Sequence, residues 1–123
     1  MASALRGLRL LVVEDILFIA DSISALLRDY GCEVVGPVGH LKQALDLARD
    51  AALDGAILDI NLDGKPSFPI AGMLSERGIP YFFVTGYNDN ILPAKYRGIP
   101  RLAKPFEDAE LEQMLLREFA RVA

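Results

Sequence analysis

The sequence has few of the features that mark secreted, membrane-spanning or nucleic-acid-binding proteins. Its single cysteine, Cys32, cannot form an internal disulfide and so gives no sign of an oxidising compartment. The apolar run at residues 10–13 stops at Glu14 and Asp15, so we expect no signal peptide, no membrane span and a cytoplasmic protein. Basic residues number 13 against 17 acidic ones, and the net charge of −4 does not favour direct binding of DNA or RNA.

Apolar residues are plentiful, at 52% of 123 residues, which suffices for one domain with a hydrophobic core. Short apolar runs predict strands at residues 8–13, 33–38, 55–60, 80–84 and 99–103. Segments with helical spacing follow them, at residues 16–30, 41–52, 89–95 and 107–122. A further helix is expected somewhere within residues 66–77, and Pro66 and Pro69 leave its start open. This alternation predicts an α/β fold over residues 1–123: a doubly wound, five-stranded parallel sheet with five helices covering both faces.

Two prolines refine this pattern. Pro37 cannot donate to a strand ladder, so the second strand is expected at an edge of the sheet. Pro93 is tolerated only in the first turn of a helix, so the fourth helix is expected to be short.

Polar side chains stand where four of the predicted strands end: Glu14 with Asp15, then Asp59, Thr85 and Lys104. Each alone has an ordinary explanation as a helix cap, a turn residue, a strand-end hydroxyl or a solvated charge. The carboxyl ends of parallel strands meet at one edge of a sheet, however, and ligands bind there. All of them together predict a functional site.

Charge repulsion at this site calls for a cation. Two carboxylates ~4 Å apart repel by about 4 kcal/mol at an effective dielectric constant near 20. Lys104 can offset one carboxylate, and Mg²⁺, which takes oxygen ligands and keeps several waters, suits the others. The site includes no cysteine or histidine, which does not favour zinc.

Four motifs carry these side chains: Val12-Val13-Glu14-Asp15, Leu58-Asp59-Ile60-Asn61-Leu62, Val84-Thr85-Gly86 and Lys104-Pro105-Phe106. Together they make the chain resemble the response-regulator receiver domains of two-component signalling along essentially its whole length. The resemblance implies a flavodoxin-like sheet with strand order 2-1-3-4-5. It also implies that Asp59 accepts a phosphoryl group. Mg²⁺ would be bound by Asp15, Asp59 and the backbone carbonyl of Asn61, while Glu14 assists through water.

The chemistry of phosphoryl transfer agrees with these roles. In-line attack by a carboxylate requires charge to be neutralised on the equatorial phosphoryl oxygens. Mg²⁺, the Lys104 ammonium and the Thr85 hydroxyl would each meet one of them. The bond from Lys104 to Pro105 is a candidate for the cis isomer, which the sequence leaves open.

The chain departs from the usual receiver pattern at the position three residues before the lysine. Receivers commonly place a Tyr or Phe there as a switch, and this sequence has Arg101, which is either a solvated charge or a partner contact. Residues 83–87, Phe-Val-Thr-Gly-Tyr, resemble the signature of the alphaproteobacterial FAT GUY subgroup, which also lacks that aromatic. We hypothesise that Tyr87 and the short helix after it change order on phosphorylation.

The loop after Asp59 is unusual as well, because Asp63-Gly64-Lys65-Pro66 replaces the commoner methionine-containing turn. Lys65 is either solvated or directed into the acidic crevice. His40 lies before the second helix, away from the acidic residues, so we expect it at the surface.

The expected function is that of a stand-alone response regulator, monomeric or weakly dimeric. By resemblance its partner is a histidine kinase or a histidine phosphotransfer protein. Leu17, an apolar residue next to the acid pair, is a candidate docking residue, whereas Ile16 fits docking and the core stripe equally well. Pro105 and Phe106 are expected on the same partner surface. One alternative is a Mg²⁺-dependent phosphatase acting through an aspartyl-phosphate. The haloacid-dehalogenase type would need an Asp where this chain has Asn61.

Two further alternatives are weaker. A flavin-binding electron carrier would need a phosphate-binding loop after the first strand, where this chain has acidic residues. A degenerate receiver that never accepts phosphate conflicts with the complete set of acid, hydroxyl and lysine side chains.

Overall fold

The computed structural model describes residues 2–86 and 92–120, and a parallel sheet of five strands forms their centre. The strands of this sheet are β1 (Arg9–Val13), β2 (Glu33–Val38), β3 (Gly55–Asp59), β6 (Tyr81–Thr85) and β7 (Arg101–Ala103). Their order across the sheet is β2-β1-β3-β6-β7, and every neighbouring pair is parallel. The predicted doubly wound, flavodoxin-like topology with order 2-1-3-4-5 is therefore confirmed.

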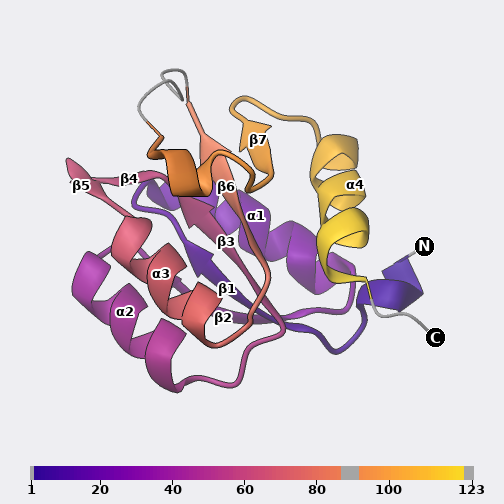
Figure 1. Ribbon diagram of the computed structural model, residues 1–123. Coiled ribbons are helices and arrows are strands. Elements are labelled where there is room, and N and C mark those ends of the chain that lie inside the picture. The colour runs from indigo at the N-terminus through magenta and orange to yellow at the C-terminus, as the bar shows by residue number, and fades with distance from the viewer. Residues whose placement is uncertain (1, 87–91, 121–123) are drawn as a thin grey trace.

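Helices cover both faces of the sheet (Figure 1). They are α1 (Leu17–Asp29), α2 (Leu41–Asp50), α3 (Phe68–Glu76) and α4 (Asp108–Phe119), with short 3-10 helices η1 (Ala2–Leu5) and η3 (Ala94–Tyr96). In Figure 1, α2 and α3 lie on one face and α1 and α4 on the other. This arrangement leaves the edge where the strands end open for a functional site.

The number of helices differs from the prediction. The described residues contain four α-helices, and the predicted fourth helix at residues 89–95 is represented by the 3-10 helix η3. Pro93 is the residue before η3, and a single turn is all that this segment accommodates ahead of Gly98. Residues 89–91 lie outside the described residues.

Alternation along β1 builds two cores. Leu11 and Val13 belong to the apolar cluster under α2 and α3, whereas Leu10 and Val12 belong to the cluster under α1 and α4. Because successive side chains of a strand point to opposite faces, a continuous apolar run supplies both cores at once. The fully buried strands β3 and β6 follow the same rule.

The ends of individual strands also match their residues. β2 lies at an edge of the sheet, as Pro37 predicts, and its Gly36–Pro37 peptide bond is cis. Gly55 opens β3 where α4 passes closely, since a Cβ atom on Gly55 would lie 2.7 Å from the ring of Phe119. A larger residue at this position would push the helix away from the sheet.

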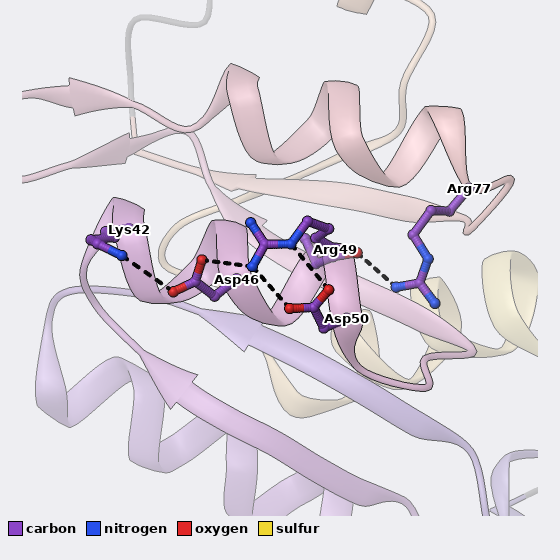
Figure 2. Close-up of polar contacts among 6 residues, drawn as sticks. Lys42, Asp46, Arg49, Asp50 and Arg77 are labelled. Carbon is purple, nitrogen blue, oxygen red and sulfur yellow. Dashed lines mark hydrogen bonds and ion pairs between the residues drawn. The ribbon is translucent and has the colours of Figure 1, made fainter.

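A hydrogen bond links the carboxyl-terminal ends of helices α2 and α3 (Figure 2). Arg77 donates a hydrogen bond of 2.7 Å to the carbonyl of Ala48, one of the last carbonyls of α2. On α2 itself, Arg49 contacts both Asp46 and Asp50.

No helix in the described part of the chain is both long and apolar enough to cross a membrane.

A hairpin that the sequence did not predict follows β3. Strands β4 (Asn61–Leu62) and β5 (Lys65–Pro66) form a two-stranded antiparallel sheet, joined by Asp63 and Gly64. The third helix consequently begins at Phe68 and not at Pro66, with Ser67 as its N-cap residue.

Candidate functional site

The structure brings the predicted acidic residues together at the carboxyl ends of the strands. Glu14 and Asp15 follow β1, and Asp59 is the last residue of β3. One carboxylate oxygen from each of the three lies within 4.8 Å of the other two. β1 and β3 are direct neighbours in the sheet, which is why their ends converge.

Lys104 supplies the positive charge at this site. It follows β7, and its side chain reaches back so that Nζ lies 2.7 Å from Glu14 Oε1 and 3.3 Å from Asp59 Oδ2. The Lys104–Pro105 peptide bond is cis, the isomer for which the sequence made it a candidate. One ammonium thus faces two of the three carboxylates.

Glu14 is the most deeply buried charged group of the site, with a side chain only 1% exposed. Burial raises its pKa from the ordinary value of 4.5 to about 7, and the neighbouring Asp59 carboxyl adds to this rise. The ammonium of Lys104 and the backbone N–H of Ile16, which donates to Oε2 at 3.1 Å, act in the opposite direction. Near neutral pH, Glu14 can therefore hold or release a proton.

Lys104 keeps its charge at neutral pH. Its partial burial disfavours the ammonium, but the carboxylates of Glu14 and Asp59 outweigh this, and the pKa of Lys104 rises above its ordinary value. The ammonium is accordingly a permanent counter-charge for Asp59.

Backbone amides hold the two remaining carboxylates. The N–H of Asn61 donates to Asp59 Oδ1 at 3.2 Å, and the N–H of Asp63 donates to Asp15 Oδ2 at 2.8 Å. Asp59 is 7% exposed, whereas Asp15 is exposed to solvent. In this cluster of Glu14, Asp15, Asp59 and Lys104, which we call the crevice, the Asp59 carboxylate is therefore buried and the Asp15 carboxylate is open to solvent.

Thr85 ends β6 beside β3, as the sequence predicts. The residue is buried, and its hydroxyl donates to the carbonyl of Gly86 at 3.3 Å. Its own carbonyl accepts a hydrogen bond of 2.7 Å from the N–H of Lys104. This backbone contact fixes Thr85 and Lys104 to each other at the same edge of the sheet.

The donor set fits a hard divalent cation. Its available ligands are oxygens, and Lys104 pairs most closely with Glu14, so Asp15 and Asp59 are the better candidates to bind a metal. Three carboxylates against one ammonium also leave the crevice with net negative charge when all are ionised. Mg²⁺ satisfies both conditions.

Other residues singled out from the sequence lie around the crevice. Lys65 lines a small surface pocket with His40 and Lys42, and His40 is exposed, as expected. Arg101 is exposed on β7. Tyr87 lies outside the described residues.

The apolar surface next to the crevice is larger than predicted. Leu17 is 72% exposed, and Phe18, which sequence reasoning missed, is 80% exposed. Phe18 also lines an apolar groove together with Pro105 and Phe106. A signal existed in the sequence, because Phe18 falls outside the apolar stripe that packs α1 onto the sheet.

The chain is similar to known proteins in sequence and in fold. The family model of the response regulator receiver domain matches residues 10–116. The structure of SdrG from Sphingomonas melonis Fr1 is similar at 35% identity and a TM-score of 0.79, over 89% of this chain and 93% of that one. The receiver domain of the sensor histidine kinase PA1611 from Pseudomonas aeruginosa PAO1, solved with a magnesium ion coordinated in the active site cleft, is 26% identical with a TM-score of 0.72, over 90% and 96% of the two chains.

Curated relatives are longer. The transcriptional regulatory protein PdtaR of Mycobacterium tuberculosis is 27% identical over 107 residues, which are 84% of this chain and 52% of that protein. The chain thus spans about half the length of such relatives. From the family match and the geometry of the crevice, we conclude that the chain belongs to the response-regulator receiver domains of two-component signalling.

Proposed function

We propose that this chain accepts a phosphoryl group on Asp59 in a Mg²⁺-dependent reaction and signals by binding a partner protein or by passing the group on. The observation that carries the proposal is the crevice itself, where Asp59 is held between the Lys104 ammonium and the Asn61 amide, next to Asp15. A phosphoacceptor role is consistent with the family, whose members are signalling domains and not classical enzymes.

Each contact of Asp59 supports its role as nucleophile. Lys104 faces Oδ2 and the Asn61 N–H faces Oδ1, so the carboxylate is oriented and its charge is compensated. In the proposed transfer, a carboxylate oxygen forms a bond to phosphorus while the bond from phosphorus to the donor histidine nitrogen breaks, and the electron pair stays on that nitrogen.

Charge develops on the phosphoryl oxygens during this transfer. Mg²⁺ held by Asp15, Asp59 and the Asn61 carbonyl would neutralise part of that charge. The ammonium of Lys104 is already within 3.3 Å of Asp59, so it needs little movement to meet a phosphoryl oxygen. Thr85, anchored to Lys104 through its carbonyl, would offer its hydroxyl to another.

Glu14 assists by holding Lys104. Glu14 Oε1 lies 2.7 Å from Lys104 Nζ, whereas Asp59 Oδ2 lies 3.3 Å from it, and the Glu14 side chain is almost wholly buried. When Mg²⁺ is bound and Glu14 is ionised, the pair keeps the ammonium at the site instead of in solvent. The part that the resemblance gives to Glu14, assisting Mg²⁺ through water, stays a prediction.

The proposed phosphodonor is a histidine kinase or a histidine phosphotransfer protein. Leu17 and Phe18 are exposed at the start of α1, and Phe18 lines an apolar groove together with Lys104, Pro105 and Phe106. Such a surface suits a partner that must bring a phosphohistidine to Asp59. Because β7 carries Arg101 where receivers commonly have an aromatic ring, output without a ring switch is part of the proposal.

The test is the intact mass of the protein after incubation with acetyl phosphate, with and without Mg²⁺, for the wild type and for Asp59→Asn. We expect a gain of one phosphoryl group that requires Mg²⁺ and is absent in the variant. A gain that persists in Asp59→Asn would place the acceptor elsewhere. Absence of any gain, from acetyl phosphate and from a set of phosphohistidine proteins alike, would overturn the proposal.

A further inference from the structure

The β4–β5 hairpin contacts both carboxylates that are free to bind a metal. The Asn61 amide donates to Asp59 at 3.2 Å, and the Asp63 amide donates to Asp15 at 2.8 Å across 48 residues of sequence. These two N–H groups belong to residues only two apart in the chain, and each ends on a carboxylate of the site. One edge of one short hairpin therefore holds one oxygen of each acid.

The strand pairing explains why this edge is available. Leu62 and Lys65 are the closing pair of a two-residue turn, and Asn61 faces Pro66 as the next pair. Pairs in an antiparallel ladder alternate between bonded and non-bonded, and Pro66 has no N–H to donate. The N–H of Asn61 consequently points away from β5 and donates to Asp59.

The conformation of the hairpin is defined by the turn at its tip, by a hydrogen bond at its base and by one buried side chain. At its tip, Asp63 and Gly64 have φ angles of 50° and 84°, the left-handed pair that a type I′ turn requires. At its base, the Ser67 N–H donates to the Ile60 carbonyl at 2.8 Å. Leu62, between the two, is 2% exposed and belongs to the core under α2 and α3. The amide of Asp63 is thus presented at a fixed place.

We infer that this hairpin is a positioning element for the metal site, and that the backbone amide of Asp63 sets the orientation of Asp15. Within the described residues, the Asp63 N–H is the one hydrogen-bond partner of the exposed Asp15 carboxylate. Orienting the carboxylate on one oxygen leaves the other for the cation and reduces the rotamer freedom lost on binding. The inference rests on the proposed role of Asp15 as a Mg²⁺ ligand.

A set of variants at position 63 separates the amide from the carboxyl side chain. Asp63→Pro removes the N–H, whereas Asp63→Asn keeps it, tolerates a positive φ and removes the charge. We expect Asp63→Pro to weaken Mg²⁺ binding about tenfold, as the loss of a group that orients a metal ligand does. Asp63→Asn is expected to stay within about twofold of the wild type. Isothermal titration calorimetry gives the affinities, and urea unfolding shows that each variant is folded.

A second measurement needs neither metal nor phosphate, and it holds even where proline disturbs the hairpin. Amide hydrogen exchange by NMR, in EDTA, compares the wild type with Asp15→Ala. We expect the Asp63 amide to exchange about fivefold faster in the variant, because it loses its acceptor. The Asn61 amide, which donates to Asp59, is the matched control and should keep its rate.

Two results would overturn the inference: an unchanged exchange rate at Asp63, or a loss of Mg²⁺ affinity in Asp63→Asn as large as in Asp63→Pro. The second would assign the effect to the side chain. The same experiments test the proposed function separately. A wild-type protein that binds no Mg²⁺ would refute the metal role of the crevice. Amide exchange would still decide whether the hairpin orients Asp15.

Discussion

Replacing Glu14 with glutamine is expected to remove a pH dependence from the stability of the metal-free protein. The Glu14 side chain is 1% exposed, and burial raises its pKa from 4.5 to about 7. A carboxyl group whose pKa is higher in the folded state binds its proton more tightly there. The folded state is therefore favoured at low pH, and stability decreases as the pH rises from about 4.5 to about 7.

The size of this effect follows from the same two values. Each pH unit between them costs about 1.4 kcal/mol, because the unfolded chain has released a proton that the folded chain retains. Across the window from 4.5 to about 7, the loss amounts to about 3 kcal/mol. That is a large part of the 5–15 kcal/mol that stabilises a typical domain.

The assay is urea unfolding in EDTA at about pH 5 and about pH 7.5, for the wild type and Glu14→Gln. The quantity of interest is the change in unfolding free energy between the two pH values, which cancels every group that titrates equally in both proteins. Between about pH 5 and about pH 7.5, we expect the unfolding free energy of the wild type to fall by about 2 to 3 kcal/mol more than that of Glu14→Gln. Equal changes in the two proteins, within about 0.5 kcal/mol, would refute the reasoning.

Three further outcomes can be checked with simple variants. Gly55→Ala should destabilise the protein by about 1–3 kcal/mol in urea unfolding, because the new Cβ atom would clash with the ring of Phe119 on α4. Its control is Gly98→Ala, where the new Cβ atom meets nothing within 4 Å and the effect should stay below about 0.5 kcal/mol. Arg77→Ala should cost about 1 kcal/mol in the same assay through the lost bond to α2. Leu17→Asp and Phe18→Asp should each slow phosphotransfer from a phosphohistidine protein more than tenfold, because about 2 kcal/mol of docking energy is lost, while labelling by acetyl phosphate should keep its rate. Equal slowing of both reactions would argue against docking at these residues.

Much of the fold could be predicted because it depends on patterns that a single chain displays. Alternating apolar runs and helical stripes fixed the order of the elements, and Pro37 identified the edge strand. The start of α3 could not be read in the same way. Pro66 is compatible with the first turn of a helix and with a strand edge, and only the pairing of Asn61 with Pro66 decides between them.

The side chains of the site were easier to predict than their contacts. Asp59, Thr85 and Lys104 stand at strand ends, and parallel strands bring such residues together whatever the loops do. The contact between the Asp63 amide and Asp15 has no such signal. It joins backbone to side chain across 48 residues, and a two-residue strand is too short to display a hydrophobic period. Asp63-Gly64 was recognised as a turn but not as the tip of a hairpin.

The buried charges of the crevice predict that a bound metal ion and the proton on Glu14 would compete. Three carboxylates and one ammonium make up the crevice, and the high pKa of Glu14 relieves the excess of negative charge in the metal-free protein. A divalent cation bound by Asp15 and Asp59 would relieve the same excess and lower the cost of ionising Glu14. By linkage, binding of Mg²⁺ below about pH 7 must release a proton from Glu14, so its apparent affinity should fall by up to tenfold for each pH unit below that value. Glu14→Gln, which keeps the shape of the side chain and cannot titrate, should bind Mg²⁺ with an affinity that varies much less over the same range.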